Sequence, residues 1–548
     1  MKIYNIIASI FLSSLLVGCN DNFLDRRPEA ISDENYWNTT DDLEAYANSF
    51  YSILPSGLTS NGDGNSDDQV PHSRPSYFWD EYPIPANGGG WAKSDWARIR
   101  ELNHFMNHYT KAGGDQVDIN QYVGEVRFFR AMQYSAKIRT FGDVPWFDKD
   151  LKTTDIEILY GPKTKRDLVM DKIIEDFDFA IQWLPDNPKA GRIGKNVARH
   201  LKARTCLHEG TYYKYHTQMN LQQKSTSLLA LAAQTAKDII ETGKYEIYTT
   251  GKPEKDYYEM FLIDDKSSLK EAILPVGYLK DLHPHNTSRS LSEAKTGFSK
   301  DFVNNYLCSD GLPIALSQLY KGDKTMEAET ANRDPRLSQT IHNPKFPIRI
   351  SDGGDSIFIA EEDYISDVCY TGYRIRKYYS PLEKDNQAKS NTYDGIAYRY
   401  AETLLIYAEA KAELGTISLE DLDITINKLR ERAGMPPMTL EVGFSDPNWT
   451  NWGYAITPLL QEIRRERRVE LAGEGLRLDD LKRWKAGQIA DRIETYTGKW
   501  VENENKYAEV YPNYLGKRMW NDRLYLYPIP TGEIQKNENL LPQNPGWN

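Results

Sequence analysis

The sequence contains little cysteine, and its cysteines follow no metal-binding pattern. Only four occur in 548 residues, and none belongs to a CxxC or Cys/His arrangement, which argues against the common zinc motifs. Their spacing also indicates no disulfide framework, so pairing among the last three stays open. The four are Cys19, Cys206, Cys308 and Cys369.

Positive charge is scarce relative to negative charge. The chain carries 67 Lys and Arg against 79 Asp and Glu, a net charge of -12. Without a dense basic stripe, this balance argues against a nucleic-acid partner. The mean hydropathy is -0.64, and no apolar run after the first 18 residues approaches membrane length, so we expect a water-soluble mature chain.

Motifs of several enzyme and metal classes are missing as well. There is no G-x-S-x-G, no Walker loop and no G-x-G-x-x-G before a helix. The stretch from Asp63 to Asp68 opens like a calcium loop, but it lacks the glycine at position six and the glutamate at position twelve. We expect a solvated acidic turn there, with calcium as the weaker alternative, and no other cofactor.

The first 19 residues carry a processing signal. Lys2 precedes an apolar run from Ile6 to Val17, which is about 12 residues and too short to span a membrane. Leu16-Val17-Gly18-Cys19 resembles the lipobox of bacterial lipoproteins. The resemblance implies removal of residues 1–18, lipidation of Cys19 and a membrane anchor, with 19–36 as a polar tether. An ordinary signal peptide with a chance cysteine is the alternative.

Most of the chain shows helical periodicity. Thr39 to Asp42 has the composition of a helix cap, and the repeated pairing of helices predicts a mainly α fold of stacked helix pairs. Short apolar runs such as 271–276 predict a few strands. The predicted helices cover 43–54, 94–109, 123–140, 166–184, 196–215, 227–241, 398–414, 419–433 and 458–472.

Two stretches break this periodicity. Residues 55–92 are dense in Gly, Pro, Asn and Asp yet rich in aromatics, and long loops of this kind in compact domains are usually functional or disordered. Residues 244–395 mix short strands with loops. We therefore expect ligand-facing segments at about 55–96 and 244–391.

These segments hold the candidate ligand-binding residues. Flat aromatic faces with amide, acidic or Arg side chains nearby suit a ligand that has both apolar faces and hydrogen-bonding groups. The structural alternative is a core position, which is favoured for Trp96; contact with a protein partner is a further alternative for the exposed aromatics. The candidates are Arg74, Tyr77, Trp79, Asp80, Tyr82, Asn87, Trp91, Trp96, Tyr278, His283, His285 and Asn286. The proline between His283 and His285, and the lack of a nearby third ligand, argue against a metal pair.

The densest charged cluster lies between Arg464 and Asp480. Paired carboxylates there could serve acid–base hydrolysis. However, the charges alternate in sign at helical spacing, which favours ion pairs within and between helices. We expect a structural network, and no catalytic residues. Arg127, Arg130 and Arg139 are likewise expected to pack and pair rather than to grip a ligand.

Several stretches together resemble the SusD/RagB family of Bacteroidetes outer-membrane lipoproteins. They occur in the family's order and extend over most of the chain. They are RFFRAMQYSAKIRTFGDVPWF at 127–147, YRYAETLLIYAEAKAELG at 398–415, NKLRERAGMP at 427–436, IRRERRVELAGEGLRLDDLKRW at 463–484 and YLYPIPTGEIQKNENLLPQNPGWN at 525–548. The resemblance implies a single SusD-like domain over 37–548 with about four tetratricopeptide-like helix pairs.

The resemblance also implies a role. Its members sit at the cell surface, capture oligosaccharides or polysaccharides and pass them to a SusC-like TonB-dependent transporter, without cleaving them. The acidic residues soon after Cys19 resemble a surface-export signal, so we expect a lipid-anchored, surface-exposed outer-membrane protein. Two alternatives stay open: a peptide-capturing protein like RagB, and a surface enzyme that cleaves glycans.

Overall fold

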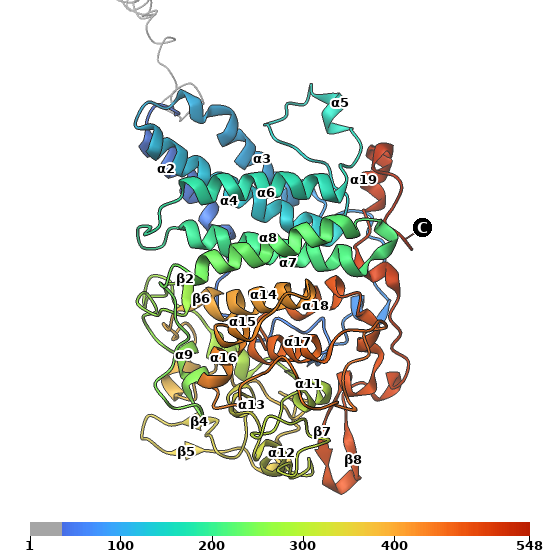
Figure 1. Ribbon diagram of the computed structural model, residues 1–548. Helices are drawn as coiled ribbons and strands as arrows, with labels where there is room; N and C mark the ends of the chain where they lie inside the picture. Colours follow the sequence, from blue (N-terminus) through green and yellow to red (C-terminus); the bar gives the residue numbers. More distant parts are fainter. Residues whose placement is uncertain (1–35, 548) are drawn as a thin grey trace, which may run out of the picture.

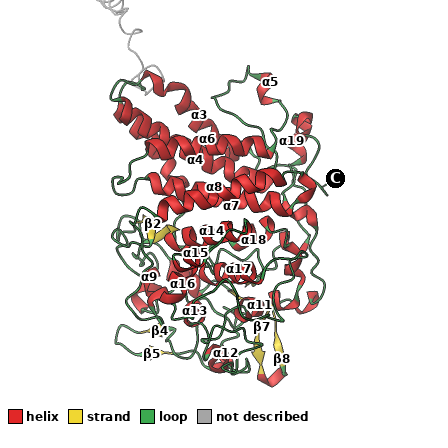
Figure 2. Cartoon of the chain, in the orientation of Figure 1, coloured by secondary structure: helices red, strands yellow, loops and turns green. Residues whose placement is uncertain are grey.

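Helices stack in layers through the upper half of the molecule as drawn in Figure 1, and loops fill much of the lower half. The structure, a computed structural model, describes residues 36–547, so the predicted signal sequence and Cys19 lie outside the described residues. The helical layers therefore form a scaffold for the loop-rich part. Figure 2 shows how few strands accompany the helices.

The helices of the scaffold, which include all the long ones, come from two separate parts of the chain. The N-terminal set is α2 (Thr40–Asn48), α3 (Lys93–His108), α4 (Gln116–Phe141), α5 (Ile156–Leu159), α6 (Arg166–Trp183), α7 (Lys195–Tyr215) and α8 (Gln222–Ile240). The C-terminal set is α14 (Tyr400–Glu413), α15 (Leu419–Asp423), α16 (Ile426–Arg432), α17 (Pro458–Glu470), α18 (Arg477–Arg483) and α19 (Thr531–Lys536).

Short elements make up the loop-rich part. Its helices are α9 (Asp256–Phe261), α10 (Thr287–Ser292), α11 (Lys300–Asn304), α12 (Met326–Thr330) and α13 (Pro335–Thr340). The strands form antiparallel pairs: β1 (Gln69–Pro71) with β3 (Thr296–Phe298), β2 (Ala272–Val276) with β6 (Gly395–Arg399), β4 (Arg349–Ile350) with β5 (Ser356–Ile357), and β7 (Thr497–Val501) with β8 (Lys506–Glu509).

Local sequence explains where the first long helices begin and end. Thr39 and Asp42 form the predicted capping box of α2, in which each side chain accepts a hydrogen bond from the other residue's backbone N–H. Asp115 caps α4 by accepting from the Val117 N–H. Gly142 ends α4 with a φ of 74°, which a side chain would disfavour.

Small residues let neighbouring helices approach closely. A Cβ atom on Gly210 of α7 would lie 3.0 Å from the Leu229 side chain of α8, a tight contact that glycine avoids. Gly124 of α4 lies against Ala180 of α6, where an added Cβ atom would make an ordinary van der Waals contact at 3.6 Å. The buried apolar core runs between these helices and on to α14. Burial of this core is the main stabilising contribution.

The predicted helices are confirmed in position, but several ends differ: α4 begins at Gln116 rather than at 123, and residues 398 and 399 belong to β6 rather than to α14. The predicted helix 419–433 is divided into α15 and α16 around Ile424 and Thr425. The predicted helix 458–472 is α17, and the charged stretch continues into a second helix, α18, after Gly473 and Gly475, which both adopt positive φ values. The strand predicted within 271–276 is β2. Helical periodicity therefore placed the helices but missed breaks of a few residues.

Cys206, Cys308 and Cys369 are buried free thiols. In residues 36–547, no helix combines the length and apolar character needed to cross a membrane. Within the same range, no group of His, Cys, Asp and Glu side chains is arranged to hold a metal ion.

Candidate functional site

The densest charged cluster is buried and fully engaged in ion pairs. Glu470 of α17 accepts from Arg336, Arg399 and Arg432 at 3.0, 3.0 and 2.5 Å. Arg483 of α18 binds Glu409 of α14 at 2.5 Å. Burial by itself would raise the pKa of Glu470, but the three guanidinium groups outweigh it and lower that pKa. The cluster joins helices to one another, as the spacing predicted.

The acidic stretch from Asp63 to Asp68 belongs to this buried network, so the prediction of a solvated turn is wrong. Asp67 is fully buried and binds Arg477 at 2.7 Å and Arg468 at 3.1 Å. Asp68 binds Arg468 at 2.6 Å. Burial, with Asp68 nearby, raises the pKa of Asp63 to about 7. Asp67 and Asp68 therefore neutralise two arginines, and Asp63 accepts from the Arg477 backbone N–H.

The aromatic residues between 74 and 82 hold the C-terminal segment in place. The Tyr77 ring stacks on Tyr527 at 4.4 Å, and the Trp79 ring meets Tyr496 edge-on at 5.2 Å. Both side chains are buried. The half-buried residues of this stretch have partners in the same region: Asp80 binds Arg523, Arg74 lies over the Tyr514 ring and binds Glu81, and Tyr82 contacts Tyr527 and Trp547.

Trp91 and Trp96 pack against α4. The Trp91 ring is buried and meets Phe141 edge-on at 4.8 Å. The Lys137 ammonium lies 4.6 Å from the centre of the half-buried Trp96 ring and donates to the Gly90 carbonyl. Burial lowers the pKa of Lys137 to about 8. Asn87, in the preceding loop, is exposed.

The four candidates from the middle of the chain do lie together. The Tyr278 ring stacks on His283 at 4.9 Å and meets His285 edge-on at 4.7 Å. Asn286 accepts from the Lys389 N–H. Tyr278 is buried and His285 half-buried, whereas His283 and Asn286 are exposed.

The predicted candidates therefore form three groups at separate places. Within residues 36–547, no hydrogen bond, ion pair or ring contact joins the 74–82, 87–96 and 278–286 groups. The rings of Trp79 and Trp91 are packed against protein, which leaves little of them for a ligand. A ligand-binding role for the exposed members, Asn87, His283 and Asn286, stays a prediction.

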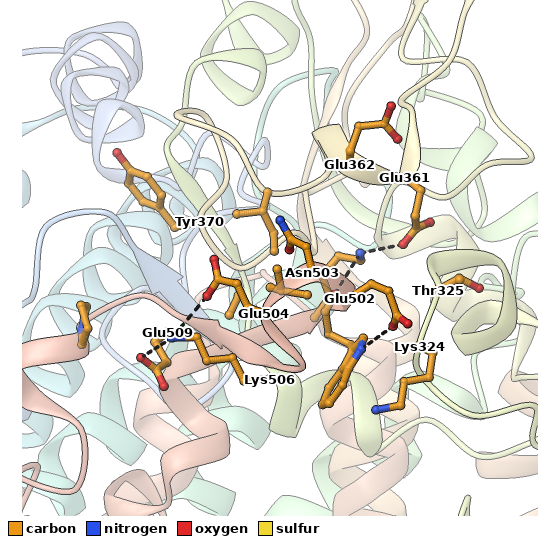
Figure 3. Close-up of a pocket in the computed structure, with 16 residues that line it drawn as sticks. Lys324, Thr325, Glu361, Glu362, Tyr370, Glu502, Asn503, Glu504, Lys506 and Glu509 are labelled. Atoms are coloured by element: carbon orange, nitrogen blue, oxygen red, sulfur yellow. Dashed lines mark hydrogen bonds and ion pairs between the residues drawn. The ribbon is translucent and has the colours of Figure 1, made fainter.

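A large open cavity lies elsewhere, at the β7–β8 hairpin. Its volume is about 710 Å³, and it is bounded by the hairpin, by Lys324 and Thr325, and by the segment around Glu361 to Tyr370 (Figure 3). The hairpin projects at the lower end of the molecule, far from α2 where the described chain begins (Figure 1).

Close backbone contacts fix the hairpin beside the 361–371 segment. The Lys499 N–H donates to the Thr371 carbonyl at 2.8 Å. A Cβ atom on Gly498 would lie 2.1 Å from that carbonyl oxygen, so only glycine permits this approach. The buried Lys499 side chain binds Glu361 at 2.6 Å. One wall of the cavity is thus rigidly attached to the other.

The cavity presents aromatic rings together with polar groups. Trp500 pairs across the hairpin with Tyr507, and its indole N–H donates to Glu502 at 2.8 Å. The Lys324 ammonium lies over the Trp500 ring. Tyr370 forms part of the other wall and contacts the His72 ring at 4.6 Å. An aromatic surface with hydrogen-bonding groups around it suits a hydroxyl-rich ligand.

Sequence analysis included one wall of this cavity in the ligand-facing segment predicted at about 244–391, but it did not single out any of the lining residues and missed the hairpin. Trp500-Val501 and Tyr507-Ala508 are short apolar pairs on either side of a polar run at 502–506, which is a usable hairpin signal. The turn places Asn505 at a φ of 50°. The residues that complete the cavity lie more than a hundred positions upstream, and no sequence pattern connects them.

Comparison with known proteins gives consistent matches. A model of the SusD family matches residues 279–547. The chain is 27% identical to SusD-like protein P2 of Formosa agariphila over the full length of both, and 22% identical to a SusD-like protein of Bacteroides ovatus over 86% of this chain and 80% of that protein.

Solved structures show the same fold. A SusD-like protein of Bacteroides fragilis superposes with a TM-score of 0.73 at 24% identity, covering 94% of this chain and 98% of the other. A second protein of that organism, described as a SusD-like carbohydrate binding protein, gives a TM-score of 0.68 at 23% identity and covers 92% and 100%.

Fold and cavity together define a class: stacked helix pairs that carry a loop-rich part with an open, partly aromatic cavity. Within this class, the chain belongs to the SusD/RagB family, as the sequence motifs predicted.

Proposed function

We propose that this protein is a lipid-anchored surface protein that captures an oligosaccharide or polysaccharide in the β7–β8 cavity and delivers it to a SusC-like TonB-dependent transporter. The main support for the proposal is the cavity itself, in which the aromatic rings of Trp500 and Tyr370 lie beside charged and amide side chains. The described binding of carbohydrate by a structural relative supports the ligand class.

The position of the cavity is consistent with capture at a cell surface. The described chain begins near α2, and a tether from Cys19 would join it there, at the end opposite the hairpin (Figure 1). The 16 residues between Cys19 and Tyr36 reach at most about 55 Å when extended. An anchor at Cys19 would thus allow the cavity to face away from the membrane.

Glycan binding is tested with the chain from residue 20, which keeps every described residue. Affinity electrophoresis and calorimetry against a polysaccharide panel should identify a ligand for wild type. Trp500→Ala and Tyr370→Ala should each weaken binding about tenfold or more, which corresponds to about 1.4 kcal/mol. The matched control is Tyr160→Ala, an exposed tyrosine on the α5 loop.

Each alternative function has its own outcome in this experiment. Binding of peptides and of no glycan would replace the proposal with a peptide-capturing protein. New reducing ends released from a bound glycan would show an enzyme. Glycan binding that survives both cavity substitutions would keep the function and move the site, with His283 and Asn286 as the next residues to change.

The anchor and the partner need separate tests. Cys19→Ala should move the protein from the membrane fraction to the soluble fraction. The wild-type protein should co-purify with the transporter from detergent-solubilised outer membranes. Membrane association that persists in Cys19→Ala, after the transporter has been deleted, would contradict the lipid anchor.

A further inference from the structure

The cavity has an excess of negative charge. Five glutamates and three lysines line it, which leaves an excess of two negative charges. The glutamates are Glu361, Glu362, Glu502, Glu504 and Glu509, and the lysines are Lys324, Lys499 and Lys506 (Figure 3).

The lysines already have partners within the protein. Lys499 is buried and binds Glu361 at 2.6 Å. Lys506 lies 3.3 Å from both Glu504 and Glu509. Lys324 covers the Trp500 ring. An anionic ligand would have to draw a lysine away from one of these partners and expose the carboxylate that it leaves.

The carboxylates include groups still able to accept hydrogen bonds. Glu362 is exposed and makes no ion pair within residues 36–547. Glu502 is exposed at the hairpin turn, with one oxygen accepting from the Trp500 indole. Ionised carboxylates accept hydrogen bonds and do not donate them, so they favour ligands rich in O–H or N–H groups.

We infer that the cavity selects glycans that are uncharged or carry amino groups, and rejects sulfated or uronate-containing glycans. Hydroxyl and ammonium groups donate to the glutamates, while the C–H face of a sugar ring packs on an aromatic ring. A sulfate or carboxylate group meets like charge at short range, where the protein surroundings screen it less than bulk water does. This inference depends on the glycan-capture function proposed above.

The test uses two probe sets with the chain from residue 20. The first contains starch, laminarin, xyloglucan, mannan and chitosan oligosaccharides. The second contains alginate, polygalacturonate, carrageenan and dextran sulfate. We expect binding within the first set only, with at least a tenfold affinity difference from every member of the second set at 0.15 M salt.

A charge-removing variant checks that the glutamates cause this selection. If chitosan oligosaccharides bind, the double variant Glu362→Gln/Glu504→Gln should weaken their binding relative to that of an uncharged ligand. If no amine-bearing ligand binds, the double variant should raise the affinity for dextran sulfate about tenfold. Glu246→Gln, an exposed glutamate beside α8, is the matched control. If the double variant had the same affinities as wild type for both probe sets, the inference would be overturned.

The outcomes separate this inference from the proposed function. If an anionic polymer binds and Trp500→Ala abolishes that binding, the charge selection is wrong but glycan capture stands. If no polymer of either set binds, glycan capture itself fails and the inference fails with it. Binding of first-set polymers alone, lost in Trp500→Ala, supports both.

Discussion

Two regions of this molecule are rich in charged side chains, and they differ in burial. The α17–α18 network lies inside the scaffold, and its charges are matched by partners from distant parts of the chain. The cavity at β7–β8 is lined by charges that, except for Lys499, are exposed or half-buried, with an acidic excess. Charge content alone therefore does not distinguish a structural region from a candidate binding region; burial and pairing do.

The largest difference should appear when one carboxylate is removed from each region. Glu470→Gln leaves three buried arginines without their shared partner, and we expect a loss of about 3–5 kcal/mol in the free energy of unfolding. Glu509→Gln in the cavity removes a carboxylate whose partner Lys506 is exposed, so we expect less than about 1 kcal/mol. Urea unfolding of both variants measures this, and equal losses would remove the distinction.

Trp79 tests whether an aromatic residue of the 55–96 segment is structural. Trp79→Ala removes contacts with Tyr496 and Tyr511, and we expect a loss of about 3 kcal/mol with faster proteolysis of the C-terminal segment. Tyr160→Ala, at an exposed ring, serves as the control. A stable Trp79→Ala protein that no longer binds glycan would return this residue to the binding site.

Acid should destabilise the helical scaffold through buried histidines. Burial lowers the pKa of His216 to about 3, from a usual value near 6.5. Because the unfolded chain takes up a proton below about pH 6.5 and the folded chain does not until about pH 3, stability falls as pH decreases through this window. One such group contributes up to about 1.4 kcal/mol per pH unit.

His216→Gln should reduce the dependence of the free energy of unfolding on pH. The glutamine side chain can still donate a hydrogen bond to the Lys482 carbonyl, which lies 2.8 Å from Nε2 of His216 in the wild-type protein. Urea unfolding at pH 7, 6 and 5 compares the two proteins. His200 and His208, whose pKa values burial also lowers, should keep part of the slope. If the variant and wild type showed the same dependence of unfolding free energy on pH, His216 would take up its proton equally well in the folded and the unfolded chain, and its pKa would not be lowered.

The smallest effect on stability should come from the cavity aromatic. Trp500→Ala removes a half-buried ring at the hairpin, and we expect a loss of about 1 kcal/mol or less in the free energy of unfolding. The same substitution should weaken glycan binding about tenfold. Thermal unfolding and calorimetry on one preparation give both values. A large stability loss without an affinity change would place Trp500 with Trp79 as a structural residue.

Helices and the ion-pair network were predictable because their signals are local. Leu404, Leu405 and Ala408 recur at helical spacing, and the charges of α17 alternate along one element. The burial of Trp79 could not be predicted for a physical reason: Gly and Pro near Trp79 indicate a turn, but they say nothing about what covers the ring. Its cover, Tyr496 and Tyr511, comes from the other end of the chain.

The sequence by itself determined the family, the position of most helices and the structural character of the Arg/Glu cluster, because each depends on neighbouring residues. Tertiary structure decided which aromatics are buried and where a cavity opens. Arg468 and Asp68 bind each other across 400 residues, and Lys324 reaches Trp500 from a different segment. Such contacts follow from how the elements pack in space, and the residues next to each position do not encode them.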